Sequence, residues 1–152
     1  MPLFRDLPGV AADPSAVGAS QEIWLSEAGH LTQFGCFIHV LPPGSATSLK
    51  HWHQEEDELV YLLDGTLTLI EGDAEIAMQK GDCATFKAGD PVGHCLRNDG
   101  PAEARLLVVG TCKPAECITY PDHDVILTYD DDKGTKEFRD FAGNPTISAY
   151  LK

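Results

Sequence analysis

The stretch KHWHQEEDELVYLLDG, residues 50–65, places two histidines, His51 and His53, and a carboxylate, Glu58, in a segment with the pattern of a β-hairpin. Successive side chains of a strand point to opposite faces, so His51 and His53 are expected to share one face while Lys50 points to the other. A neighbouring strand after the acidic loop would bring Glu58 back to the imidazoles. Two nitrogens and one oxygen on one side of an ion are typical of a divalent metal site with open positions.

Short apolar stretches separated by turn signals continue this pattern from residue 22 to about residue 110. About eight or nine such stretches at roughly ten-residue spacing predict an all-β, closed or two-sheet architecture with few or no helices. The first expected strand is EIWLSE, residues 22–27. The turns between the strands are expected at Pro42-Pro43-Gly44, Asp64-Gly65, Gly72-Asp73 and Lys80-Gly81-Asp82.

The two ends of the chain differ from this central part. Residues 1–21 are rich in Pro, Ala, Gly and Ser and predict an arm without helical periodicity. Near the other end, DVILTYD (124–130) and KEFRDF (136–141) predict a further hairpin. At 152 residues, we expect a single domain over 1–152, with a barrel core at about 22–110 and a C-terminal extension at about 111–152.

Composition excludes several classes of partner. The 24 acidic and 11 basic residues give a formal charge of −13, which disfavours binding to nucleic acid or to anionic membrane surfaces. The N-terminus lacks a basic start followed by an apolar run, and no long apolar run occurs, so we expect a cytoplasmic chain that contacts no membrane. The five cysteines match neither a disulfide framework nor a Cys-x-x-Cys zinc site, which predicts mostly buried free thiols.

A second motif lies at residues 81–98, GDCATFKAGDPVGHCLRN, where His94 begins an apolar strand after a loop rich in Gly and Pro. Together, the spacings of His51-x-His53, Glu58 and Gly65, and then of Gly81-Asp82 and His94-x-x-x-Asn98, resemble the two motifs of the cupin superfamily. The resemblance implies a double-stranded β-helix, a jelly-roll barrel, with metal ligands at His51, His53, Glu58 and His94. Small single-domain bacterial cupins are especially similar, because a YPD segment and a tail follow their barrel, as Tyr120-Pro121-Asp122 does here.

The implied cofactor is one divalent transition metal, and this ligand set accepts Fe, Mn, Zn, Ni, Co or Cu. Cupins include isomerases, dioxygenases, decarboxylases and binding modules, so the fold alone selects no reaction. We expect a metal-dependent enzyme that acts on a small-molecule ligand, either sugar-phosphate isomerase-like or dioxygenase-like. The alternatives are a non-catalytic binding or sensing module, and a pocket that keeps these residues without a metal. A sugar phosphate requires a cation; Lys50 and Arg97 fall on the outer face, which leaves Lys87 in the mouth loop.

Other polar residues receive ordinary interpretations. His30, His39 and His123 are expected to be core or surface histidines, whereas Asp57 is a candidate to orient an imidazole. Exposed edge strands need cover, so the N-terminal arm and residues 22–27 are expected to pair with the sheet of a second copy. This predicts a homodimer.

Overall fold

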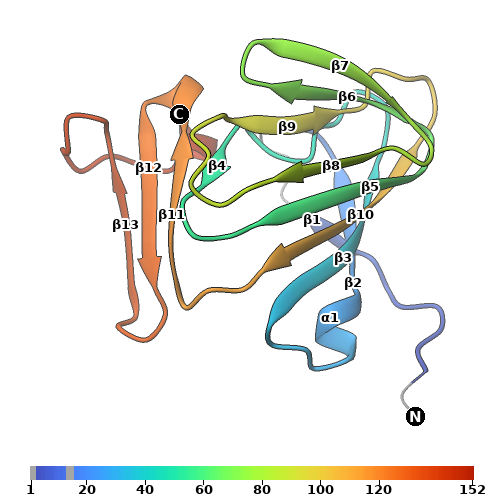
Figure 1. Ribbon diagram of the computed structural model, residues 1–152, viewed down its shortest axis with the longest axis horizontal. Coiled ribbons are helices and arrows are strands. Elements are labelled where there is room, and N and C mark those ends of the chain that lie inside the picture. Colours follow the sequence, from blue (N-terminus) through green and yellow to red (C-terminus); the bar gives the residue numbers. More distant parts are fainter. Residues whose placement is uncertain (1–2, 13–15) are drawn as a thin grey trace.

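The computed structural model describes residues 3–12 and 16–152, in which antiparallel sheets face each other across a common interior (Figure 1). The first sheet contains, in spatial order, β1 (Val10–Ala12), β2 (Ser20–Trp24), β3 (Phe34–Leu41), β10 (Ala104–Thr111), β5 (Glu58–Asp64) and β8 (Cys83–Phe86). The facing side contains β7 (Ala74–Gln79), β6 (Thr66–Glu71) and β9 (His94–Arg97).

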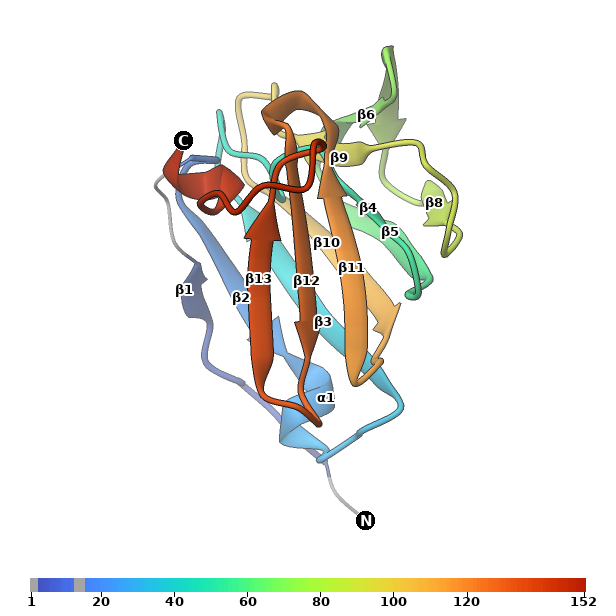
Figure 2. The same cartoon turned by 90° about the vertical axis from the view of Figure 1, so that its left-hand side faces the viewer.

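A third sheet, formed largely by the C-terminal extension, lies beside β9. Its order is β13 (Thr135–Arg139), β12 (Val125–Asp130), β11 (Ala115–Tyr120) and β4 (Trp52–His53), and Figure 2 shows β11 to β13 side by side. An isolated antiparallel bridge between His51 and His94 connects the β4 side to β9. The strand that carries His53 is therefore held between the barrel and the extension.

The all-β prediction is confirmed. Helical structure in the described residues is limited to α1 (Leu25–Ala28) and two 3-10 turns, η1 (Pro121–His123) and η2 (Ala149–Leu151). The predicted C-terminal hairpin is also confirmed, because β12 pairs antiparallel with β13. No helix in the described ranges is long and apolar enough to span a membrane.

Alternation of side chains along the strands builds the barrel core. In β5, Val60 and Leu62 are buried whereas Tyr61 between them is exposed, as expected for a strand with one face on the interior. Their neighbours across the sheet on β10 are Val108 and Leu106, which are also buried. The main core cluster contains Leu41, Val60, Leu62, Leu67, Leu69, Met78, Phe86, Leu96, Ala104, Leu106 and Val108.

The turn at Gly65 shows why glycine is required between β5 and β6. Its φ is +87°, and a Cβ atom there would lie 2.9 Å from the Cα atom of Ala104. Both the backbone angle and the close approach exclude larger residues. This turn sends β6 into the facing layer of the barrel.

Three sequence-based expectations are wrong in detail. Residues 50–65 do not form a hairpin, because β4 pairs with β11 whereas β5 pairs with β10 and β8. EIWLSE is divided between the end of β2 and α1, and β2 already pairs with β1 and β3 of the same chain. Among the cysteines only Cys95 is buried, although all five are free.

Within the chain, β3 pairs with β2 along residues 21–24, whereas β1 covers the other edge of β2 only at residues 20–22. The homodimer itself stays a prediction. Sedimentation velocity on the full chain tests it directly.

Candidate metal centre

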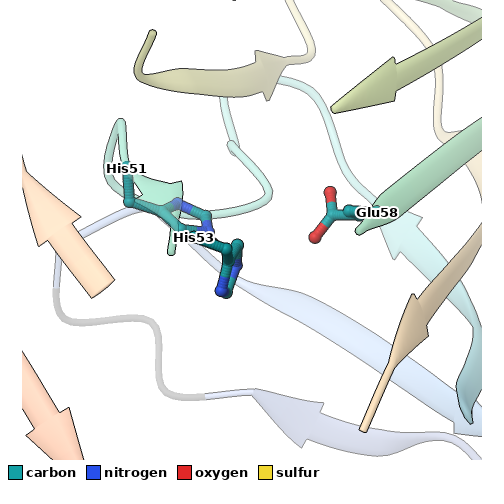
Figure 3. Close-up of side chains that lie close together, drawn as sticks. All are labelled: His51, His53 and Glu58. Atoms are coloured by element: carbon teal, nitrogen blue, oxygen red, sulfur yellow. Dashed lines mark hydrogen bonds between the residues drawn. The ribbon is translucent and has the colours of Figure 1, made fainter. Parts of the chain in front are cut away.

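His51 and His53 point to the same side of the chain, as their spacing predicts (Figure 3). Their Nε2 atoms lie 3.1 Å apart, and the rings meet edge to face with centroids 4.9 Å apart. Two nitrogens that bind one ion at about 2.1 Å, roughly at right angles, lie about 3 Å apart. The observed separation therefore fits a shared metal ion.

The hydrogen-bond partner of Nδ1 indicates which nitrogen of the His51 ring carries the hydrogen. Nδ1 lies 2.9 Å from the carbonyl oxygen of Leu49, which can only accept a hydrogen bond. The Ser48 hydroxyl, 3.2 Å from the same nitrogen, can accept as well as donate, so the nearer Leu49 oxygen favours a hydrogen on Nδ1. This tautomer leaves a lone pair on Nε2, which faces His53. The short Nε2–Nε2 contact consequently needs either a hydrogen on His53 Nε2 or a cation shared by the two rings.

Glu58 reaches the histidines from the opposite sheet. The acidic loop after β4 crosses to β5 in the first sheet, so the carboxylate faces the imidazoles across the interior and does not come from a neighbouring strand (Figure 3). One ligand atom from each of His51, His53 and Glu58 lies within 4.8 Å of the others. The structure thus brings together three of the four predicted ligands.

Electrostatics support a cation at this position. Burial raises the pKa of Glu58 to about 7, with a further contribution from the charge of Glu56. Burial also lowers the pKa of His51 to about 4, and it lowers the pKa of His53. Neutral imidazoles offer lone pairs to a metal, while the half-buried Glu58 carboxylate has no Lys or Arg partner among the residues that the structure describes. A divalent ion supplies that charge, so these residues fit the metal that the motif implies.

His94 lies beside this group but is not one of its mutually close members. Its backbone exchanges two hydrogen bonds with that of His51, and its Nε2 lies 3.8 Å from Oε1 of Glu58. The ring stacks on Phe86 with a centroid separation of 3.5 Å, and burial lowers its pKa to about 3. Neither ring nitrogen has a hydrogen-bond partner among the described residues. His94 therefore remains a predicted ligand, with a free nitrogen close to Glu58.

A pocket of about 570 Å³ opens onto the site. Apolar side chains of its wall include Phe34, Leu59, Phe86, Val92 and Val109, and the site residues lining it are His53, Glu58 and His94. Lys87 is the only Lys or Arg among its described lining residues, whereas five carboxylates line it, those of Glu56, Asp57, Glu58, Glu71 and Asp90. The pocket is therefore acidic and apolar, with one cation at the mouth.

The predicted outward positions of Lys50 and Arg97 are confirmed. Lys50 donates to the carbonyl oxygen of Gly72 and pairs with Asp122, and Arg97 pairs with Glu75 and Asp99. Neither side chain lines the pocket described above.

The remaining predicted residues have structural roles. His39 is buried as a core histidine, 3.1 Å from the Ser20 hydroxyl. Asn98 of the second motif donates to Leu41 and Ala102 carbonyl oxygens and is fully buried. Asp57 accepts a hydrogen bond from the backbone N–H of Ala88 in the mouth loop, so its role differs from the imidazole contact that the sequence suggested.

The carboxylates nearest to an imidazole nitrogen of His53 are instead Glu116 and Glu56, at 3.7 Å and 4.0 Å from Nδ1. Sequence reasoning missed Glu116, which lies on β11 in the extension. A signal was present: in AECITY, residues 115–120, Glu116 shares the strand face of Ile118 and Tyr120. A carboxylate on an otherwise apolar face indicates a buried, partnered charge.

Comparison with known proteins agrees with this geometry. A family model described as a cupin domain matches residues 37–110. A sugar phosphate isomerase of the cupin superfamily from Silicibacter pomeroyi is 36% identical, covering 93% of this chain and 91% of that chain, with a TM-score of 0.81. The chain belongs to the cupin superfamily. No curated protein matches this cupin in sequence.

Two further solved structures share the fold at lower identity. A candidate sugar phosphate isomerase from Acidithiobacillus ferrooxidans is 24% identical over 94% of this cupin and 91% of that chain, with a TM-score of 0.84. A protein from Thermotoga maritima, described as a predicted oxalate decarboxylase, is 22% identical over 71% of this cupin and 95% of that chain, with a TM-score of 0.62. The likeness to the Acidithiobacillus ferrooxidans structure extends beyond the barrel into the C-terminal extension, since it covers 94% of this chain.

Proposed function

We propose that this cupin is a metal-dependent enzyme that isomerises a small phosphorylated sugar. The observation that carries the proposal is the convergence of His51, His53 and Glu58 beside a 570 Å³ pocket, which His53 and Glu58 line. The 36% identity to a protein described as a sugar phosphate isomerase supports this substrate class. His94, beside Glu58, completes the proposed ligand set of one divalent transition metal.

When bound, the metal acts as a Lewis acid that polarises a carbonyl or enediol oxygen of the substrate. The residues of this chain supply the rest of the site. His51, His53 and Glu58 would hold the ion beside the pocket, and the apolar wall around Phe86 limits the access of water. Lys87 lies at the mouth, where its ammonium group is available to a substrate phosphate.

Lys87 provides the test of the phosphorylated class. We expect metal-loaded parent protein to interconvert aldose and ketose phosphates, and we expect Lys87→Gln to raise KM for them by about tenfold, the scale of one charge-assisted contact. The KM for the matching unphosphorylated sugars should stay unchanged. An equal effect of K87Q on both series would mean that Lys87 does not bind phosphate.

A second candidate is a dioxygenase-like activity on an uncharged substrate. The apolar wall and the single cation among the described lining residues favour such a ligand over a dianion. Oxygen consumption by iron-loaded protein, in the presence of enols or diketones, distinguishes it from the isomerase. Tight binding of a sugar phosphate without turnover in either assay would instead indicate a non-catalytic binding module.

A further inference from the structure

Glu116 of the C-terminal extension is held rigidly behind the histidine strand. Its side chain is 0% exposed. Oε1 accepts backbone N–H groups from Gln54 at 3.0 Å, Glu55 at 3.1 Å and Cys117 at 2.6 Å. Two of these amides directly follow His53 in the chain, so the carboxylate is fixed relative to that residue.

This orientation directs Oε2 of Glu116 toward Nδ1 of His53, 3.7 Å away. Glu56 places a second carboxylate oxygen 4.0 Å from the same nitrogen. Nδ1 is shielded from solvent and has no hydrogen-bond partner within residues 3–12 and 16–152. A lone pair on Nδ1 would be repelled by both carboxylates, whereas an N–H group there is attracted. The local field therefore favours the tautomer with the hydrogen on Nδ1.

We propose that Glu116 is a positioning residue of the metal site, which keeps the hydrogen of His53 on Nδ1 and leaves Nε2 free to bind the ion. The proposal rests on the metal-dependent function above. His51 already has its hydrogen on Nδ1, bonded to Leu49, and its lone pair on Nε2. The other tautomer of His53 would donate from Nε2 to this lone pair across 3.1 Å. That hydrogen bond would occupy the two nitrogens that the metal needs.

Glu116 thus selects between an open and a closed histidine pair. In the open pair both Nε2 lone pairs face the ion; in the closed pair they are joined by a hydrogen bond. A carboxylate behind a ligating imidazole is a known way to fix its tautomer. Here the carboxylate comes from the C-terminal extension, outside the matched cupin domain at residues 37–110.

Glu116→Gln tests the proposal with little change in shape. The amide oxygen retains the Oε1 position and its three backbone donors, while an NH2 group replaces Oε2 in front of His53 Nδ1 and loses only the longer, 3.3 Å contact of Oε2 with the Glu55 N–H. This NH2 group donates to Nδ1 and therefore favours a hydrogen on Nε2. Glu56→Gln is the matched control, because Glu56 lies farther from Nδ1 and its Oε1 is held by the backbone N–H of Lys113.

The tautomers are read from imidazole nitrogen-15 NMR shifts of metal-free protein, with the His53 signals assigned by their loss in His53→Gln. Zinc affinity is measured by competition with a chelator. Without the ion, the 3.1 Å contact with His51 favours a hydrogen on Nε2 of His53, and Glu116 opposes this from the Nδ1 side. We therefore expect a larger Nδ1–H fraction of His53 in the metal-free parent than in E116Q, and zinc affinity about 10-fold to 100-fold weaker in E116Q. In E56Q the nearer carboxylate, Glu116, remains, so the Nδ1–H fraction of His53 should fall less than in E116Q, and zinc affinity should weaken less.

The proposal is overturned if metal-free parent and metal-free E116Q have the same Nδ1–H fraction of His53. It is also overturned if E116Q lowers this fraction without weakening zinc binding. A parent protein that binds no divalent ion would overturn the proposed function instead. The comparison of tautomers in metal-free protein would still decide the role of Glu116.

Discussion

The barrel and the C-terminal extension meet at the strand that carries His53, and they surround the two histidines in different ways. From the barrel, Glu58 and His94 project toward the pocket, as members of recognisable motifs. From the extension, Glu116 lies near His53, and the ring of Tyr120 lies 5.8 Å from that of His51. Both extension residues are buried; Tyr120 opens the YPD segment, whereas Glu116 belongs to no motif.

The extension also supports the chain segment that leads to His51. The hydroxyl oxygen of Tyr150, in the last 3-10 turn, accepts a hydrogen bond from the backbone N–H of Leu49. The carbonyl oxygen of the same residue, Leu49, accepts from His51. The difference between the two regions is therefore one of proposed roles: the barrel motifs provide the candidate metal ligands, and the extension packs behind the imidazoles, where we propose that it orients them.

The largest effect is expected from removal of the histidine pair. In His51→Ala, His53→Ala double-variant protein, metal content should fall to background, because both Nε2 donors at 3.1 Å are lost. His123→Ala is the control, since His123 lies in η1 and is not part of the ligand group. Elemental analysis of purified proteins measures this. A full metal complement in the double variant would mean that the barrel motif does not form the site.

Glu58→Gln is expected to have the next largest effect, because it removes the carboxylate charge that the barrel contributes to the site and keeps the size of the side chain. Metal affinity should fall about 10-fold to 100-fold, the scale for altered metal surroundings. A chelator competition assay measures the loss, and unchanged affinity would exclude Glu58 as a ligand.

The same variant gives a pH signature in metal-free protein. With the pKa of Glu58 raised to about 7, the folded chain binds more protons than the unfolded chain above the ordinary value of 4.5. This group therefore makes the parent less stable as pH rises through that window. E58Q should match the parent near pH 4.5 and be more stable by about 3 kcal/mol at pH 8. The lowered pKa values of His51 and His94 act in the opposite sense, but they largely cancel in the difference between the two proteins.

Urea unfolding with chelator present, at both pH values, measures that difference. If E58Q were much less stable than the parent at both, Glu58 would belong to the structural framework of the barrel.

The contrast between the two regions also explains what could be predicted from sequence. Alternation and turn signals are local, so they identified the strands, the shared face of His51 and His53, and the all-β fold. Strand pairing is not local: Glu58 arrives from the opposite sheet, which no pattern within residues 50–65 encodes. Glu116 meets the amide of Gln54 across 62 positions of the chain, so only its unusual charge on an apolar face was visible.

The smallest predicted effect tests whether the two regions unfold as one unit, using a matched pair of valines. Val60, 1% exposed, lies in the barrel core, and Val125, 0% exposed, lies in the separate core of the extension. Replacing either valine by alanine removes buried methyl groups and should lower the unfolding free energy by about 1–3 kcal/mol. Because β11 pairs with β4, and the buried Glu116 accepts hydrogen bonds from backbone N–H groups of the loop after His53, we expect each variant to unfold in one transition at a lower temperature.

Calorimetry of metal-free Val60→Ala and Val125→Ala proteins decides this. A separate early transition in V125A alone would show that the extension unfolds by itself, and zinc binding between the two transitions would then show that the barrel holds the ion without it.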